Sequence, residues 1–204
     1  MFSGIVEATS PIIKTKSQSG SLKIELQKPS FFEDLRVGGS IAVNGVCLTL
    51  EAFTTEFMTF TLAAETLHIT QWSEATLNGC WCNLERSLKL SDRIDGHFVS
   101  GHVDAVGWVV SRRLVGDNLF LDIGFPAELK PMIWKKGSIA VHGVSLTLNE
   151  VIKMDSGEEK FQVCVIPETQ RQTNLLSLQE GSRVNLEVDM WARAFVAHMK
   201  RRDQ

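Results

Sequence analysis

The chain contains GSIAVNGVCLTL at residues 39–50 and, 98 residues later, GSIAVHGVSLTL at residues 137–148. The two stretches differ at only two of twelve positions, where Asn44 becomes His142 and Cys47 becomes Ser145. Shorter matches follow in the same order, between residues 3–6 and 100–103, 65–66 and 168–169, and 83–85 and 185–187. Self-similarity at a nearly fixed spacing marks an internal repeat. We therefore expect two homologous domains, 1–94 and 95–189, followed by a separate C-terminal segment, 190–204.

The composition restricts the classes of function. The 204 residues include 21 basic and 24 acidic side chains, a net charge of −3, so no overall positive field attracts nucleic acid or an anionic membrane. A small neutral or anionic ligand is the favoured partner. The four cysteines have no framework spacing, which indicates free thiols in a reducing compartment. We see neither a signal peptide nor an apolar stretch long enough to span a bilayer, so we expect a soluble, cytoplasmic protein.

The apolar residues within each repeat alternate with polar ones, as in Leu22, Ile24 and Leu26, and again in Phe57, Phe60 and Leu62. A period of two is typical of short β-strands. Turns rich in Gly, Asn, Asp and Ser separate many such strands, and closure into a barrel removes exposed strand edges from so small a domain. We therefore predict an all-β fold class in which each repeat forms a small antiparallel Greek-key barrel.

The C-terminal segment has a different period. Trp191, Phe195 and Met199 recur every four residues, and a run of cations closes the segment at residues 200–202. This pattern predicts an amphipathic helix over 190–204, with the cations at the end that the helix dipole favours. A helix this short needs an apolar surface to cover its stripe. Because no similar segment follows the first repeat, we expect this helix to form a contact between subunits.

One face of the repeated strand carries polar side chains in both copies. Alternation places residues 46, 48 and 50 in the core and Cys47 and Thr49 on the opposite face, and Ser145 and Thr147 follow the same pattern. A thiol or hydroxyl followed two residues later by a hydroxyl can bind a heterocycle with amide-like edges. Ordinary solvent-facing strand positions are the alternative for a single copy. The recurrence in both repeats favours a ligand site.

A second polar cluster, DGHFVSGHVD, lies just past the boundary between the repeats. His97 and His102 lack the companion ligands of a zinc site, so we expect no metal. His102 takes the position after Ser-Gly that Ile5 holds in the first repeat, which favours a functional role, whereas for His97 a structural role is equally open. Cys80 and Cys82 fit core thiols better than soft-metal ligands. No GxGxxG or other nucleotide-binding loop is present, so we expect no cofactor.

The motifs together resemble riboflavin synthase of the α type over essentially the whole chain. In order, they are MFSGIVE, SIAVNGVCLTL, ETLHIT, DGHFVSGHVD, KGSIAVHGVSLTL, IPET and RVNLEVD. The resemblance implies two six-stranded barrels and a C-terminal helix that makes the protein a homotrimer. It also implies the reaction, in which two molecules of 6,7-dimethyl-8-ribityllumazine give riboflavin and 5-amino-6-ribitylaminouracil by transfer of a four-carbon unit. No external redox cofactor or metal is then required.

The resemblance also implies a site between the first barrel of one subunit and the second barrel of its neighbour. One pocket would be lined by Gly4, Ile5, Val6, Cys47, Leu48, Thr49, Thr61, Leu62, Ala63, Ala64, Glu65 and Thr66. The other would be lined by Gly101, His102, Val103, Lys136, Ser145, Leu146, Thr147, Ile166, Pro167, Glu168, Thr169, Gln170 and Arg171. The remaining expected substrate contacts are Phe2, Ser40, His97 and Asp189.

For the chemistry, we expect His102 to accept a proton from the acidic 7-methyl group of the lumazine, or to relay it. Cys47, Ser145 and Thr147 would place or activate a nucleophile at ring carbon C7, and hydrogen bonds would stabilise the anion. The replacement of Cys47 by Ser145 between the repeats indicates that one pocket serves the donor and the other the acceptor.

Two other functions compete with this interpretation. A non-catalytic lumazine- or flavin-binding protein would share the fold but lose the polar pattern of the ligand-facing strands, which this chain retains. A barrel that serves nucleic acid or an oligosaccharide would need a basic groove with stacking aromatics, and the chain has no basic stripe and no Tyr. Catalysis is favoured over both. The sequence leaves open whether the protein associates with lumazine synthase.

Overall fold

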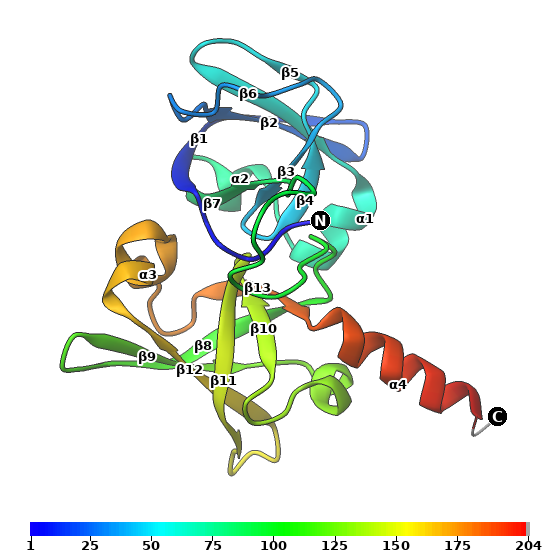
Figure 1. Ribbon diagram of the computed structural model, residues 1–204, viewed down its shortest axis with the longest axis vertical. Helices are drawn as coiled ribbons and strands as arrows, with labels where there is room; N and C mark the ends of the chain where they lie inside the picture. Colours follow the sequence, from blue (N-terminus) through cyan, green and yellow to red (C-terminus); the bar gives the residue numbers. More distant parts are fainter. Residues whose placement is uncertain (203–204) are drawn as a thin grey trace.

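The computed structural model describes residues 1–202, in which two β-structures lie one above the other and a helix extends away from the second (Figure 1). The first repeat consists of β1 (Ala8–Gln18), β2 (Ser21–Gln27), β3 (Ser40–Val43), β4 (Val46–Thr49), β5 (Ala52–Phe53), β6 (Phe57–Leu62), α1 (Ala64–Thr70), α2 (Glu74–Leu77) and β7 (Trp81–Arg86). The second consists of β8 (Ala105–Val115), β9 (Asn118–Gly124), η1 (Ala127–Met132), β10 (Ser138–Val141), β11 (Val144–Lys153), β12 (Glu159–Val165), α3 (Pro167–Gln172), η2 (Asn174–Ser177) and β13 (Arg183–Val188). Helix α4 (Met190–Arg202) follows.

Both repeats form antiparallel sheets of the same topology. The second is a closed barrel of six strands in the order β10-β11-β12-β9-β8-β13. In the first, the order is β4-β3-β7-β1-β2-β6-β5, and its two end strands are consecutive pieces of chain separated only by Leu50 and Glu51. The second repeat has the single strand β11 in that place. The all-β class with two related antiparallel barrels is confirmed, and the first barrel differs by a break in its closing strand.

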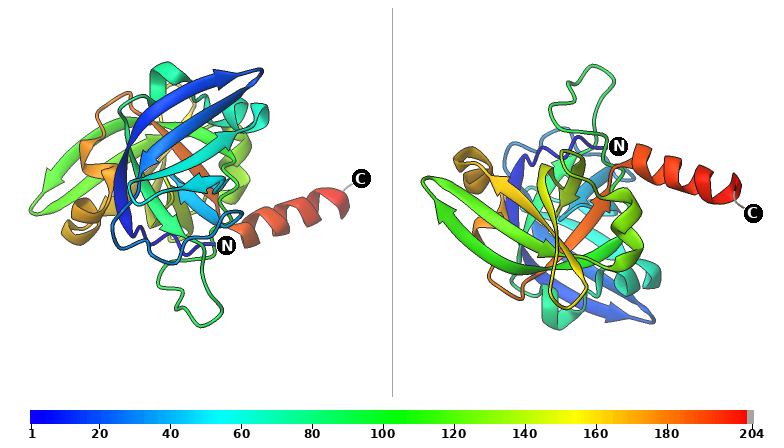
Figure 2. Two further views of the ribbon diagram at one scale, coloured as in Figure 1. Left: turned by 90° about the horizontal axis from the view of Figure 1, so that it is seen from above. Right: turned by 90° about the horizontal axis from the view of Figure 1, so that it is seen from below.

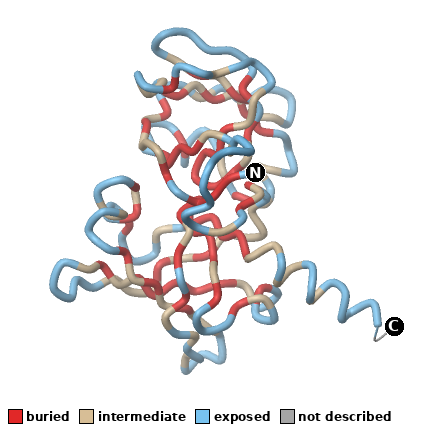
Figure 3. Tube along the Cα trace, in the orientation of Figure 1, coloured by how far each residue is buried: buried red, intermediate tan, exposed pale blue. Residues whose placement is uncertain are grey.

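The alternating residues fill two separate cores, seen as buried segments in the middle of each half (Figure 3). In β2, Leu22, Ile24 and Leu26 are buried as the alternation predicts. In β6, the inward residues are Met58, Phe60 and Leu62, whereas Phe57 is half-buried. The alternation in this strand therefore runs through Met58, Phe60 and Leu62, and Phe57 lies on the opposite face from these three residues.

The segments that precede β1 and β8 cross between the two barrels. They meet at Phe2 and Val99, which pair as a β-bridge through hydrogen bonds of 2.8 and 3.0 Å. Val6 of the first repeat then packs in the core of the second barrel, and Val103 of the second repeat packs against the core of the first. We call residues 1–7 and 97–104 the exchanged segments. Each barrel is therefore completed by chain from the other repeat.

Helix α4 points away from both barrels (Figures 1 and 2). It spans Met190–Arg202 of the predicted 190–204, and residues 203–204 lie outside the described part. Trp191, Phe195 and Met199 are 67%, 66% and 40% exposed, so no other part of residues 1–202 covers the apolar stripe. None of the helices described is both long and apolar enough to cross a membrane.

A buried polar cluster joins the two barrels at the turns before β4 and β11. The Asn83 amide donates to the backbone carbonyl of His142 at 3.0 Å, and the Asn185 amide donates to the carbonyl of Asn44 at 2.9 Å. The backbone N–H of Asn83 donates to the Asn44 side chain, and that of Asn185 donates to Nδ1 of His142. The side chains of Asn44 and His142 thus accept the equivalent backbone hydrogen bond in the two repeats.

Gly45 and Gly143 meet at the same junction, with φ near +80° and +78°. A Cβ on Gly143 would lie 2.7 Å from the backbone nitrogen of Gly45. We predict that Gly143→Ala lowers the free energy of unfolding by about 2–4 kcal/mol, because it combines left-handed backbone strain with a clash. Gly157→Ala is the control, since Gly157 has φ +89° but no neighbour within 4 Å. Equal losses for the two variants in urea unfolding would contradict the close approach.

His142 makes stability depend on pH. It is buried, and burial lowers its pKa from 6.5 to about 4. The unfolded chain therefore takes up the proton first, and stability present above pH 6.5 is lost as the pH falls towards 4, by up to about 3 kcal/mol. We predict that His142→Asn, which installs the residue of the first repeat, keeps stability at pH 7 and reduces this loss. Unfolding at pH 7 and 4.5 measures it, and the exposed His68→Asn should retain the wild-type loss.

Candidate functional site

Two pockets occupy equivalent places on the two barrels. The first, which we call the Cys47 pocket, has a volume of about 230 Å³ and is lined by Val46, Cys47, Glu65, Thr66, Ile69, Thr70, Gly101, His102 and Val103. The second, the Ser145 pocket, has a volume of about 450 Å³ and is lined by Gly4, Ile5, Val6, Glu7, Val144, Ser145, Glu168, Thr169, Gln172 and Thr173. Each pocket combines a strand and a helix of one repeat with the exchanged segment of the other.

Backbone hydrogen bonds fix these combinations. The N–H of Cys47 donates to the carbonyl of Gly101 at 2.9 Å, and the N–H of Ser145 donates to the carbonyl of Gly4 at 2.8 Å. We expected residues 4–6 to share a pocket with Cys47, and residues 101–103 with Ser145. The structure corrects this grouping, because each exchanged segment lies against the ligand-facing strand of the other repeat.

A buried glutamate holds each exchanged segment. Glu85 accepts hydrogen bonds from the Ser3 backbone, the Ser3 hydroxyl and the Gly4 backbone at 2.7, 2.9 and 3.0 Å. Glu187 accepts the equivalent three bonds from Ser100 and Gly101 at 2.7, 2.6 and 2.9 Å. Burial raises the pKa of Glu85 to about 7, although the bonds from Ser3 and Gly4 act in the opposite direction. The glutamates thus position the glycine carbonyls that close the two pockets.

The Ser145 pocket has an imidazole behind its hydroxyl. Nδ1 of His97 lies 2.7 Å from the Ser145 hydroxyl oxygen, and Nε2 is buried without a partner among the described residues. Burial lowers the pKa of His97, and the nearby charge of Asp189 partly opposes the shift. A neutral imidazole can accept the serine proton, as in other activated hydroxyl nucleophiles. His97 is therefore placed to act through Ser145.

The Cys47 pocket carries different groups on the same frame. No hydrogen bond to the Cys47 thiol is present within residues 1–202, and the imidazole in the pocket lining is that of the exposed His102. The place of His102 is taken by Ile5 in the Ser145 pocket. One pocket therefore pairs a thiol with an exposed imidazole, and the other pairs a hydroxyl with a buried one.

The helices α1 and α3 supply the outer wall of the pockets. Glu65 and Thr66 lie in the first turn of α1, and Glu168 and Thr169 lie in the first turn of α3, where sequence motifs had placed ligand contacts. Thr70 and Thr173, which also line the pockets, were not among the expected residues; their hydroxyls donate to the carbonyls of Thr66 and Thr169 at 2.7 Å. Thr70 follows Glu65 at the same spacing at which Thr173 follows Glu168, and this shared spacing is the sequence signal that could have identified both threonines.

Comparison with known proteins places this geometry in a family. The lumazine binding domain model matches residues 3–87 and 100–189. The riboflavin synthases of Actinobacillus pleuropneumoniae and Photobacterium phosphoreum are each 36% identical over 93% and 95% of this chain and 86% of their own length. The chain belongs to the riboflavin synthase family. The riboflavin synthase of Bacillus subtilis is 35% identical over 93% of the chain and 86% of its own length.

Crystal structures of LumP share the fold. The complexes with 6,7-dimethyl-8-(1'-D-ribityl) lumazine and with riboflavin each superpose with a TM-score of 0.80, covering 92% of this chain and 99% of LumP. The sequence identity is 24%, so this similarity concerns the fold alone.

Several residues that the riboflavin synthase resemblance implies as contacts are not part of the lining of either pocket. Phe2 is fully buried between the barrels, and the side chains of Leu48, Leu62 and Leu146 are in the barrel cores. Asp189 caps helix α4 by accepting the N–H of Trp191 at 2.7 Å. The other expected residues outside the two linings are Ser40, Thr49, Thr61, Ala63, Ala64, His97, Lys136, Thr147, Ile166, Pro167, Gln170 and Arg171.

Physical reasons account for these placements. Thr49 and Thr147 are exposed and face Ser40 and Ser138 across the strand pairs, two residue pairs along the strands from Cys47 and Ser145. Gln170 instead donates to the carbonyls of Asp117 and Val165 at 2.8 Å. Within residues 1–202, no group of three or more His, Cys, Asp or Glu is arranged to hold a metal ion. The polar side chains that line the two pockets are hydroxyl, thiol, carboxylate, amide and imidazole groups, which can form hydrogen bonds to a ligand.

Proposed function

We propose that the protein is a riboflavin synthase, which converts two molecules of 6,7-dimethyl-8-ribityllumazine into riboflavin and 5-amino-6-ribitylaminouracil. The observation that carries the proposal is the presence of two pockets with one backbone frame and unequal chemistry. Two copies of one frame suit two copies of one substrate, and holding reactants together removes much of the entropic barrier. The family relationship to curated riboflavin synthases supports the same activity.

The reaction balances without another reactant. One lumazine loses a four-carbon unit and becomes the ribitylaminouracil, and the other gains that unit and becomes riboflavin. The two products together contain all atoms of the two substrates, so transfer between the pockets is the whole chemistry. The protein must therefore hold both heterocycles, remove methyl protons and add a nucleophile at a ring carbon.

The residues divide these tasks between the pockets. His102 lies on the wall of the Cys47 pocket, where its imidazole takes the methyl proton of the lumazine bound there. His97 accepts the proton of Ser145, so that the hydroxyl, or a water molecule beside it, adds to ring carbon C7 in the other pocket. The thiol of Cys47 occupies the equivalent position in the first pocket. Thr147, on the same strand as Ser145, helps to place the nucleophile.

We infer that the two pockets meet across a contact between subunits, as the resemblance to riboflavin synthase implies. Helix α4 exposes Trp191, Phe195 and Met199 on one stripe, which suits packing against the same helix in other subunits. We infer a homotrimer in which the first barrel of one subunit faces the second barrel of its neighbour. The free cysteines, Cys47, Cys80, Cys82 and Cys164, fit the reducing cytoplasm as the site of the reaction.

The activity is tested by incubating the purified protein with 6,7-dimethyl-8-ribityllumazine alone. We predict the appearance of riboflavin fluorescence, and a loss of about 10²–10⁴-fold in turnover for His102→Gln because its general base is removed. His68→Gln is the matched control, since His68 lies on α1 but outside the pocket lining and should keep wild-type turnover. A shift in the ligand spectrum with no riboflavin would identify a binding protein instead. Wild-type turnover in His102→Gln would remove its role as base.

The assembly is tested on the helix. We predict that the double substitution Trp191→Ser, Phe195→Ser converts the trimer to monomers in sedimentation velocity, because it removes most of the exposed apolar stripe. Lys200→Ser, on the polar side of the same helix, should leave the trimer intact. A double variant that sediments like the wild type would refute the subunit contact.

A further inference from the structure

The exchanged segment that lines the Cys47 pocket is held at its far end by helix α4. The guanidinium of Arg193 donates to the Asp104 carboxylate at 2.7 Å and to the backbone carbonyl of His102 at 3.3 Å. The same carboxylate oxygen accepts the N–H of Val188, at the end of β13, at 2.9 Å. The Asp104 and Arg193 side chains are only 17% and 33% exposed, so the pair is partly shielded from water. One guanidinium thus joins α4, β13 and the wall of the pocket.

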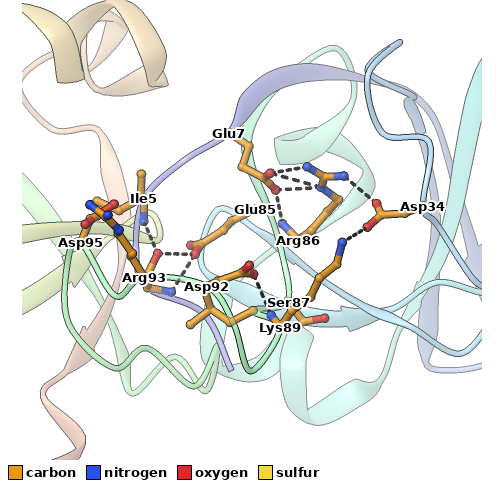
Figure 4. A pocket seen from close by; sticks show the side chains of 12 residues that line it. Ile5, Glu7, Asp34, Glu85, Arg86, Ser87, Lys89, Asp92, Arg93 and Asp95 are labelled. Carbon is orange, nitrogen blue, oxygen red and sulfur yellow. Dashed lines mark hydrogen bonds and ion pairs between the residues drawn. The ribbon is translucent and has the colours of Figure 1, made fainter.

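The first repeat contains the same arrangement with a different source of the cation. Glu7, three residues after Gly4, corresponds to Asp104, three residues after Gly101. Its carboxylate accepts the backbone N–H of Arg86 at 2.7 Å and the guanidinium of the same Arg86 at 2.6 Å, as Figure 4 shows beside Glu85. Arg86 follows Glu85 in β7, whereas Val188 follows Glu187 in β13.

The comparison shows what α4 contributes. Val188 offers only its backbone N–H, so the second repeat lacks the guanidinium that the first repeat carries on its own strand. Arg193 restores it from an element outside the repeat. Asp189 sets the position of Arg193, because its carbonyl accepts the Arg193 N–H at 3.0 Å and its carboxylate caps the helix.

We propose that Arg193 is a positioning residue for the Cys47 pocket, and that through it the seating of α4 sets the position of His102. A planar guanidinium can bind the carboxylate and the carbonyl together, which fixes both the direction and the depth of residues 102–104. Without it, the Asp104 carboxylate keeps only the Val188 N–H, and the His102 carbonyl loses its donor. The Ser145 pocket, whose exchanged segment is held by Arg86, stays as it is. The part of this inference that concerns turnover rests on the proposed function.

The test uses the full chain with Arg193→Gln, Arg193→Lys and the control Arg201→Gln, which changes an exposed cation in the last turn of the same helix. Fluorescence titration with 6,7-dimethyl-8-ribityllumazine reports ligand binding at the two pockets, and riboflavin formation reports turnover. We expect Arg193→Gln to weaken one of the two sites about tenfold or more, to leave the other unchanged, and to lower kcat/KM by about 10- to 100-fold. Arg193→Lys should recover part of the loss, and Arg201→Gln should match the wild type.

A double-mutant cycle identifies the contact. Asp104→Asn keeps an acceptor for the Val188 N–H but loses the charge that Arg193 meets, so the combined variant should be no weaker than about the worse single variant. The proposal would be overturned if the losses of binding free energy in the two single variants were additive, or if Arg193→Gln bound the lumazine like the wild type. It would also be overturned if Arg193→Gln weakened both sites equally, or if binding weakened only where sedimentation showed dissociation of the oligomer. If the wild type binds lumazine without forming riboflavin, the proposed function fails. The role of Arg193 is then still tested by whether Arg193→Gln weakens binding at one site and not at the other.

Discussion

The exchange of the segments before β1 and β8 is the constraint on which the rest of the structure depends. Buried Glu85 and Glu187 each accept three hydrogen bonds from a Ser-Gly pair, and the glycine carbonyl then pairs with the ligand-facing strand of the other barrel. A buried donor left without its acceptor costs about 1–3 kcal/mol, so loss of either carboxylate would release the segment. Each repeat therefore supplies one wall of the pocket of its partner repeat.

This common frame makes the chemical differences between the pockets interpretable. The backbone and the glutamate anchors are the same, so the unequal residues, Cys47 against Ser145, His102 against Ile5 and Ile69 against Gln172, are the places where the two pockets can take unequal roles. His97 adds a second inequality, because it stands behind Ser145 and is itself part of an exchanged segment. A dismutation of two identical molecules needs such inequality, since one copy gives carbon and the other takes it.

The sequence predicted what depends on local pattern. The repeat follows from matching the chain against itself, whereas the alternation of Val46, Leu48 and Leu50 against Cys47 and the C-terminal helix follow from short-range periodicity, and each is present. The pairing of residues 4–6 with Ser145 could not be predicted, because spacing does not say on which barrel a crossing segment packs. The contact of His97 with Ser145 and the burial of Phe2 depend on the same long-range packing. The sequence does show an acidic residue three positions after each pocket glycine, Glu7 after Gly4 and Asp104 after Gly101. Its role becomes clear only in the structure, where Arg86 and Arg193 bind these carboxylates.

The reciprocal crossing also affects how the molecule loses its structure. Val6 is part of the hydrophobic core of the second barrel, and Val103 packs against the core of the first. Disorder in one barrel therefore withdraws an apolar side chain from the interior of its neighbour and opens a hole there. The exchange therefore couples the two hydrophobic cores, so that loss of order in one barrel lowers the stability of the other.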